Sequence, residues 1–72
     1  MFQAVRYLQY KNGKQRVTTH RYLTREEAIF YARRYSKMNG FIRCDVLDED
    51  GNRVYRLTAD GTENFALVPA ED

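Results

Sequence analysis

The sequence has few of the residues that build disulfide scaffolds and metal sites: its 72 residues include one cysteine, Cys44, and one histidine, His20. A single cysteine excludes an intramolecular disulfide, so the chain is not a stapled secreted miniprotein. A structural zinc site needs roughly four Cys or His ligands in paired spacings, and the sequence does not contain them. We therefore expect no metal and no cofactor.

Residues that carry catalysis are equally scarce. No serine, cysteine or carboxylate close to His20 in the sequence forms a recognisable catalytic constellation, so we expect an ordinary strand histidine beside Val5. Cys44 is expected to be a small apolar core residue. A chain this short also leaves little room for the roughly 300–1,000 Å³ pocket of a small-molecule site. The sequence predicts a protein that is not an enzyme and has no small-molecule substrate.

Long apolar runs are absent. No stretch approaches the roughly 18 apolar residues of a membrane-spanning helix, and no signal peptide precedes Phe2. We therefore expect a cytoplasmic protein without a membrane partner, and we interpret the start at Met1 as that of a complete small protein.

Aromatic and basic residues, in contrast, are abundant: the chain has six Tyr, four Phe and 12 Lys or Arg, with a net charge of +2. The charge is uneven, because all 12 cations lie between Arg6 and Arg56 together with only six acids. A basic body suits an anionic or mixed-charge partner, although an ordinary soluble surface has a similar composition.

The N-terminal part of the chain predicts a β-hairpin. Residues 2–10 and 15–22 are rich in β-branched and aromatic side chains, and Asn12-Gly13 lies between them. Asn-Gly favours a two-residue type I′ turn, in which both residues have positive φ. With that loop, Tyr7 pairs with Thr18 on the sheet face turned away from the helix.

Residues 24–27, Thr-Arg-Glu-Glu, have the pattern of a capping box. In this motif the Thr24 hydroxyl accepts from the Glu27 N–H, and the Glu27 carboxylate accepts from the Thr24 N–H. The helix is predicted to run to about residue 39, with Gly40 as the C′ residue. At about 100° per residue, one side of it carries small or apolar side chains for packing on the sheet: Ala28, Ala32 and Tyr35.

Residues 41–47 and 53–58 predict the third and fourth strands. With Asp50-Gly51 as the loop, Asp45 pairs with Arg56, and the opposite charges favour this register. A longer loop with a bulge would shift it. Asp48-x-Asp50-Gly51 is similar to part of a calcium loop, but apolar residues occupy the first and last ligand positions, so a metal site is not predicted.

These elements predict an α+β fold: an antiparallel four- or five-stranded sheet with one helix packed on one face, in the order ββαββ(β). Residues 64–68 would supply the fifth, edge strand. Residues 1–68 are expected to form a single domain, followed by a frayed acidic tail at 69–72. The order of the two hairpins within the sheet stays open.

Phe30 departs from the helix pattern, because it lies opposite the Ala28–Ala32–Tyr35 line among charged residues. Lone exposed apolar residues are common, but an aromatic side chain ringed by arginines is typical of binding hot spots. The first candidate partner-binding surface is this helix face: Phe30, Arg33, Arg34 and Lys37.

The second candidate surface is the sheet face turned away from the helix. In the predicted registers it carries interleaved aromatic and basic side chains: Tyr7, Arg16, Thr18, His20, Tyr22, Arg43 and Arg56. Such a surface can stack bases and hold phosphates, although a solvated antiparallel face has a similar composition. The predicted contacts on it are Tyr7, Arg16 and Tyr22.

The helix segment TREEAIFYARRYSKMNG, residues 24–40, followed by a strand and DEDGN at 48–52, resembles small uncharacterised bacterial and phage domains. Those domains place a capped, Ala-rich helix between two hairpins. The layout is also similar to short phage anti-CRISPR inhibitors. The resemblance covers about residues 1–68 and carries over no functional residue. It implies a mobile-element protein that inhibits a host machine by surface binding.

These observations lead to the hypothesis of a small non-enzymatic binding module that docks on a protein or nucleoprotein complex, as a phage-type, anti-CRISPR-like inhibitor. The alternative is direct nucleic-acid binding through the basic and aromatic sheet face. A homodimer also stays open.

Overall fold

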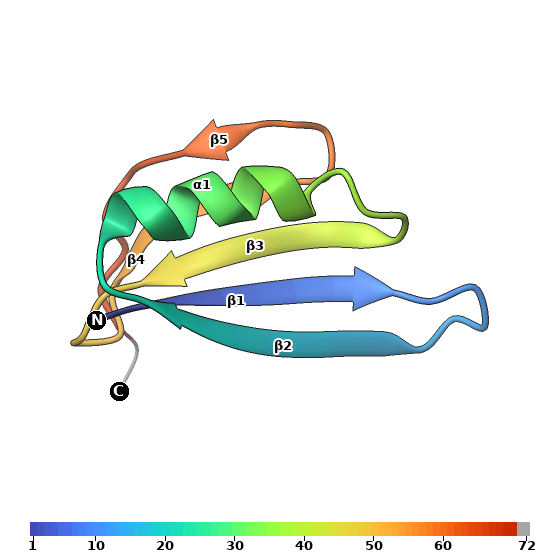
Figure 1. Cartoon of the computed structure of the whole chain (residues 1–72), viewed down its shortest axis with the longest axis horizontal. Helices are drawn as coiled ribbons and strands as arrows, with labels where there is room; N and C mark the ends of the chain where they lie inside the picture. The colour runs from blue at the N-terminus through green and yellow to red at the C-terminus, as the bar shows by residue number, and fades with distance from the viewer. Residues whose placement is uncertain (71–72) are drawn as a thin grey trace.

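The computed structural model describes residues 1–70, so the last two residues of the predicted tail, 69–72, lie outside the described chain. One helix lies across a five-stranded antiparallel sheet (Figure 1), and the predicted α+β ββαββ(β) fold is confirmed. The elements are β1 (Phe2–Gln9), β2 (Gln15–Tyr22), α1 (Arg25–Tyr35), β3 (Phe41–Leu47), β4 (Arg53–Thr58) and β5 (Glu63–Asn64). The sheet order is β2-β1-β3-β4-β5, which places β2 and β5 at the two edges.

The first hairpin closes with a three-residue loop, and the predicted type I′ turn is wrong. The Tyr10 N–H donates to Lys14 O at 2.8 Å, and the Gly13 N–H donates to Tyr10 O at 3.0 Å. Gly13 has φ +84°, whereas φ of Asn12 is not positive. This is the type I turn followed by a left-handed residue that is typical of three-residue hairpin loops. As a result, Tyr7 pairs with Val17 instead of Thr18.

A register shift of one residue moves every side chain of a strand to the other face of its sheet. His20 and Tyr22 therefore lie on the helix side, where their rings approach Tyr35 and Tyr31 of α1. Arg16 lies on the same face of the sheet as His20 and Tyr22, whereas Tyr7 lies on the opposite face. The predicted single surface of Tyr7, Arg16 and Tyr22 does not exist.

The β3–β4 hairpin has the same loop type, but a β-bulge restores the predicted pairing. The Asp48 N–H donates to Asn52 O at 2.9 Å, so the loop is longer than the predicted Asp-Gly pair. The register then shifts, leaving Val54 as the extra residue of β4. Beyond this bulge Asp45 pairs with Arg56, as predicted.

The predicted edge strand at residues 64–68 is interrupted. β5 consists of Glu63–Asn64 alone, and the chain then leaves the sheet. It returns at Val68, whose N–H and C=O both bond to the Arg53 backbone, at 2.9 and 2.8 Å. The outer edge of β4 is thus paired with two short, separate stretches of backbone.

The helix begins as predicted. Thr24 is the N-cap residue, and its Oγ1 accepts from the Glu27 N–H at 3.2 Å. The Glu27 carboxylate accepts from the Thr24 hydroxyl instead of the Thr24 backbone N–H, so one of the two predicted capping-box bonds forms. Two glutamates in the first turn also suit the helix dipole.

The helix ends at Tyr35, about four residues earlier than predicted, with Ser36 as C-cap. Gly40 is therefore not its C′ residue. Instead, Gly40 has φ +84° and lies directly against β1, where its C=O accepts from the Gln9 N–H at 2.7 Å. A Cβ at this position would collide with Gln9 O, so the strand contact requires glycine.

The core lies between α1 and the middle of the sheet. Its buried residues are Ala4, Ala28, Ile29, Ala32, Phe41, Cys44, Val46, Tyr55 and Leu57. Ala28 and Ala32 form the packing side of the helix, as predicted, and their small side chains let the helix lie close to the strands. Cys44 is the predicted core cysteine, and burial raises its pKa to about 12, so the thiol stays protonated at neutral pH.

Replacing Thr24 by Ala removes the acceptor for the Glu27 N–H. We expect Thr24→Ala to lower the free energy of unfolding by about 1 kcal/mol, as the loss of an N-cap side chain usually does. Urea denaturation followed by circular dichroism measures it. An unchanged midpoint and slope would show that another group satisfies the N–H.

Gly40 and Gly13 have the same positive φ in different surroundings. Gly13→Ala should cost about 1–2 kcal/mol, because only the left-handed backbone is strained and no atom lies near the added Cβ. Gly40→Ala should cost clearly more, because it adds the collision with Gln9 O. Equal losses in urea denaturation would mean that the segment between α1 and β3 moves away without penalty.

Candidate functional site

The helix side of β2 is left open, and a groove runs between β2 and α1. On the helix side of β2, Arg16 and His20 are exposed and Thr18 and Tyr22 are half-buried, because the helix packs over the middle of the sheet and β2 is an edge strand (Figure 1). Two hollows of about 470 and 260 Å³ share Tyr35 and Met38, and we call them together the α1–β2 groove. The larger hollow is lined by α1 and the segment after it, and only the smaller one is also lined by β2. All the charged residues that line it are basic.

The larger hollow is lined by Tyr31, Arg34, Tyr35 and Met38. The smaller one is lined by Arg6, Leu8, Tyr10, Arg16, Thr18, His20, Tyr35, Met38 and Asn39. The groove therefore contains both tyrosines and cations in its lining.

Arg6 lies in the base of the groove and is only 4% exposed. It follows Ala4 in the inward-facing phase of β1, so the strand directs its side chain towards the helix. The guanidinium carbon lies 3.4 Å from the centre of the Tyr35 ring, a cation–π contact. Burial lowers the pKa of Arg6, because removal from water disfavours the charged form.

The Arg6 guanidinium has no acid beside it. Within residues 1–70 no salt bridge or side-chain hydrogen bond involves this group, and its Nε is the one buried side-chain nitrogen or oxygen without a partner. A buried charge without a hydrogen-bonding partner is unfavourable, and the Tyr35 ring offsets only part of that penalty.

An aromatic cluster continues the groove along α1. The rings of Tyr22 and Tyr31 are stacked, with centroids 5.1 Å apart and planes at 11°. Phe30 meets the edge of Tyr31 at 5.2 Å, and the Arg34 guanidinium lies 5.7 Å from the Phe30 ring. Phe30 is 53% and Tyr31 39% exposed, so both present aromatic surface to solvent.

The predicted helix face is only partly assembled. Phe30 is exposed, as its position in the helix predicts, and Arg34 lies beside it. Arg33 points elsewhere: its Nε donates to Glu63 Oε2 at 2.8 Å, and the same oxygen accepts from the Tyr55 hydroxyl at 2.5 Å. Lys37 is exposed but lies beyond the end of α1.

The opposite sheet face uses its charges internally. The Arg56 guanidinium donates twice to Asp45, at 2.7 and 3.0 Å, which raises the pKa of Arg56. Arg43 lies over the Tyr7 ring at 3.9 Å and also contacts Asp45. Asp45 is only 6% exposed, so Arg56 and Arg43 are held in an internal cluster with this carboxylate and Tyr7.

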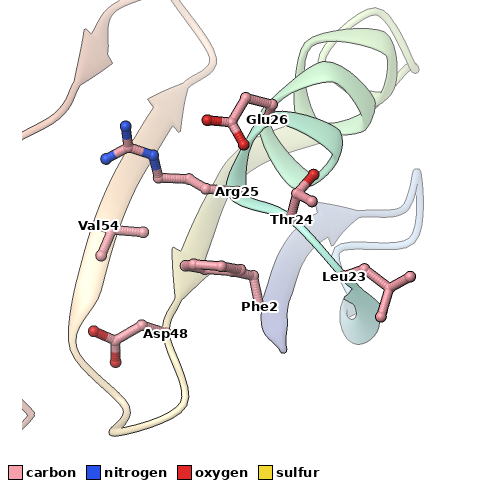
Figure 2. A pocket seen from close by; sticks show the side chains of 7 residues that line it. All are labelled: Phe2, Leu23, Thr24, Arg25, Glu26, Asp48 and Val54. Carbon is pink, nitrogen blue, oxygen red and sulfur yellow. The ribbon is translucent and has the colours of Figure 1, made fainter.

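A third hollow, of about 540 Å³, opens at the N-terminal end of α1. Figure 2 shows Phe2 and Val54 in this hollow, with Arg25 above them and Asp48 on the other side. The charges around it are of both signs, and some of its polar groups are already bonded. The Asp48 carboxylate, for example, accepts from the backbones of Asp50 and Asn52. We therefore place the functional site in the α1–β2 groove.

The sequence analysis did not identify Arg6, Tyr10, Tyr31 and Tyr35 as site residues. One signal was present for Arg6: residues 2, 4, 6 and 8 of the first strand read Phe, Ala, Arg and Leu. An arginine in the apolar phase of a strand is unusual, because Arg is almost never buried without a partner.

Comparison with protein-family models, with curated proteins and with solved structures found no match. In the described part of the chain, no helix is long and apolar enough to cross a membrane. The described residues also contain no group of three His, Cys, Asp or Glu side chains that could hold a metal ion. Function must be argued from the chemistry of the groove.

His20 provides a pH-dependent probe of the groove. Partial burial, and then the charge of Arg6, lower the pKa of His20. The other titratable groups that line the hollow around it are Tyr10 after β1, Arg16 of β2 and Tyr35 of α1. We expect NMR titration of the His20 ring to give a midpoint below about 6.5, the ordinary value.

Folding stability should fall as the pH decreases from about 6.5 through the lowered His20 pKa, because the unfolded chain takes up the proton first. His20→Gln should lose this part of the pH dependence. A midpoint at or above the ordinary value would indicate an acid close to the ring.

Proposed function

We propose that this chain is a non-enzymatic, cytoplasmic binding module for single-stranded nucleic acid, free or within a nucleoprotein complex, and that the α1–β2 groove is its contact surface. The observation that carries the proposal is the lining of the groove, which contains three tyrosines and three arginines and no acid. Aromatic rings stack bases and basic side chains hold phosphates, and single-strand binding sites combine the two.

The size of the groove suits the parts of a single strand. Hollows of about 470 and 260 Å³ have room for a base or a phosphate. The exposed ring of Tyr31 at one end offers stacking surface for an unpaired base. At the other end Arg16 is exposed and held by a hydrogen bond from its Nη1 to the Tyr10 hydroxyl, at 3.0 Å.

The second candidate function is docking on the protein part of such a complex, as an inhibitor of the kind that the resemblance to phage inhibitors implies. Phe30 favours it, because this residue is 53% exposed and lies outside the lining of the groove. An exposed aromatic side chain with Arg34 beside it is the usual composition of a protein–protein hot spot.

Fluorescence anisotropy with a labelled single strand of about 12 nucleotides, a plausible site size for one small domain, tests the first candidate. We expect binding that weakens steeply with salt, because each neutralised phosphate adds nearly one unit to the slope of log K against log salt. Tyr31→Ala should lose about 1–3 kcal/mol of binding free energy, and Tyr31→Phe should retain it, because stacking needs only the ring.

Phe30→Ala separates the two candidates. We expect it to change single-strand affinity less than Tyr31→Ala does, since Phe30 does not line the groove. A duplex of the same sequence is the matched ligand control. No binding of the single strand at low salt, or equal binding of the duplex, would contradict the first candidate.

A further inference from the structure

We propose that the smaller hollow of the α1–β2 groove is a phosphate-binding subsite centred on the buried guanidinium of Arg6, with Thr18 and Asn39 as neutral donors. The identity of the macromolecule, a single strand, rests on the function proposed above. The chemistry of the subsite is argued from the residues themselves.

The first argument is the missing partner of Arg6. Buried arginines normally bond to a carboxylate, because an unpaired charge in the interior is unfavourable. Among the described residues Asp45 is the only buried acid, and it lies on the opposite face of the sheet, bonded to Arg56. Arg6 therefore has no internal anion within residues 1–70, and an anion from outside would complete its coordination.

The second argument is the orientation of the guanidinium. Its flat face is occupied by the Tyr35 ring, at 3.4 Å, and the ring holds the plane in place. Arginine binds phosphate through the N–H groups at its edge, which lie in that plane. Stacking and phosphate binding therefore use different parts of Arg6 and can occur together.

The third argument is the set of donors around Arg6. Thr18 lies directly opposite Arg6 in the β1–β2 register and offers a hydroxyl, and Asn39 brings an amide from the segment after α1. Arg16 lines the same hollow of about 260 Å³ and adds positive charge, and His20 lines it as a further ring N–H donor. No carboxylate lines this hollow to repel an anion, and a phosphate has several oxygens to match the separate donors.

The cost of Arg6 to the folded chain is the fourth argument. Replacing an unpaired buried charge by an apolar side chain of similar length is often neutral or stabilising. If Arg6 serves binding, Arg6→Met should have a melting temperature no lower than that of the wild type, but it should no longer bind phosphate. Arg21→Met is the matched control, because it removes the same charge from an exposed position on the other face of β2.

The direct measurement follows the arginine Nε–H signals of the wild type by NMR during addition of inorganic phosphate at constant ionic strength, with chloride as reference. The Arg6 signal is identified by its absence from the spectrum of Arg6→Met. We expect this signal to shift and to saturate in the wild type and equally in Arg21→Met. An Arg6 signal that does not respond to phosphate would overturn the proposal, whether or not any variant folds.

Binding of the labelled oligonucleotide distinguishes a phosphate in a nucleic-acid strand from a free phosphate or nucleotide. Arg6→Met should bind the labelled single strand about tenfold more weakly, as loss of a hydrogen bond to a charged group implies. Arg21→Met should stay within about twofold. If both variants bind equally, the Arg6 subsite is wrong while the proposed function stands. If phosphate and uridine 5′-monophosphate shift Arg6 but no single strand binds, the subsite stands for a free nucleotide and the proposed function fails.

Discussion

The three-residue loop that ends in Gly13 decides which side of the sheet each β2 side chain occupies. Because side chains alternate along a strand, a loop one residue shorter would turn Arg16, His20 and Tyr22 to the open face. The groove would then lose Arg16 and His20 from its lining, and Val17, Thr19 and Arg21 would lie on the helix side instead. The same backbone bonds close the β3–β4 and β4–β5 hairpins, so one turn geometry organises most of the sheet.

The two faces of the sheet treat charge in opposite ways. On the open face, Asp45 accepts from Arg56 and Arg43, so both cations have an acid partner within the fold. On the helix side, Arg6 is buried with an aromatic ring and no acid within the described chain. The first arrangement stabilises the fold. The second leaves an unfavourable unpaired cation, and binding of the proposed anionic ligand would relieve that penalty. Such a local conflict is expected at a functional site.

Helix α1 shows where prediction from sequence holds. Its start was predictable because the Thr24–Glu27 bond is local, and the exposure of Phe30 followed from helix geometry. Its end was not, because the exit of the chain is set by the backbone contact between Gly40 and Gln9, which are distant in the sequence. The Asp45–Arg56 pair was predicted correctly although the predicted loop was too short. The longer loop shifts the register by one residue, and the bulge at Val54 shifts it back.

The sequence by itself determined the helix and the strands and their order along the chain, because these follow from local propensity and spacing. It also determined the buried side of α1 and the excess of aromatic and basic residues. Only the tertiary structure decided that β1 lies between β2 and β3, and that Arg6, His20 and Tyr35 meet in one groove. The physical reason is that these residues come from three elements. Their meeting depends on the turn of the first hairpin, whose sequence is compatible with both a two-residue and a three-residue loop. It also depends on strand pairing between segments far apart in the chain.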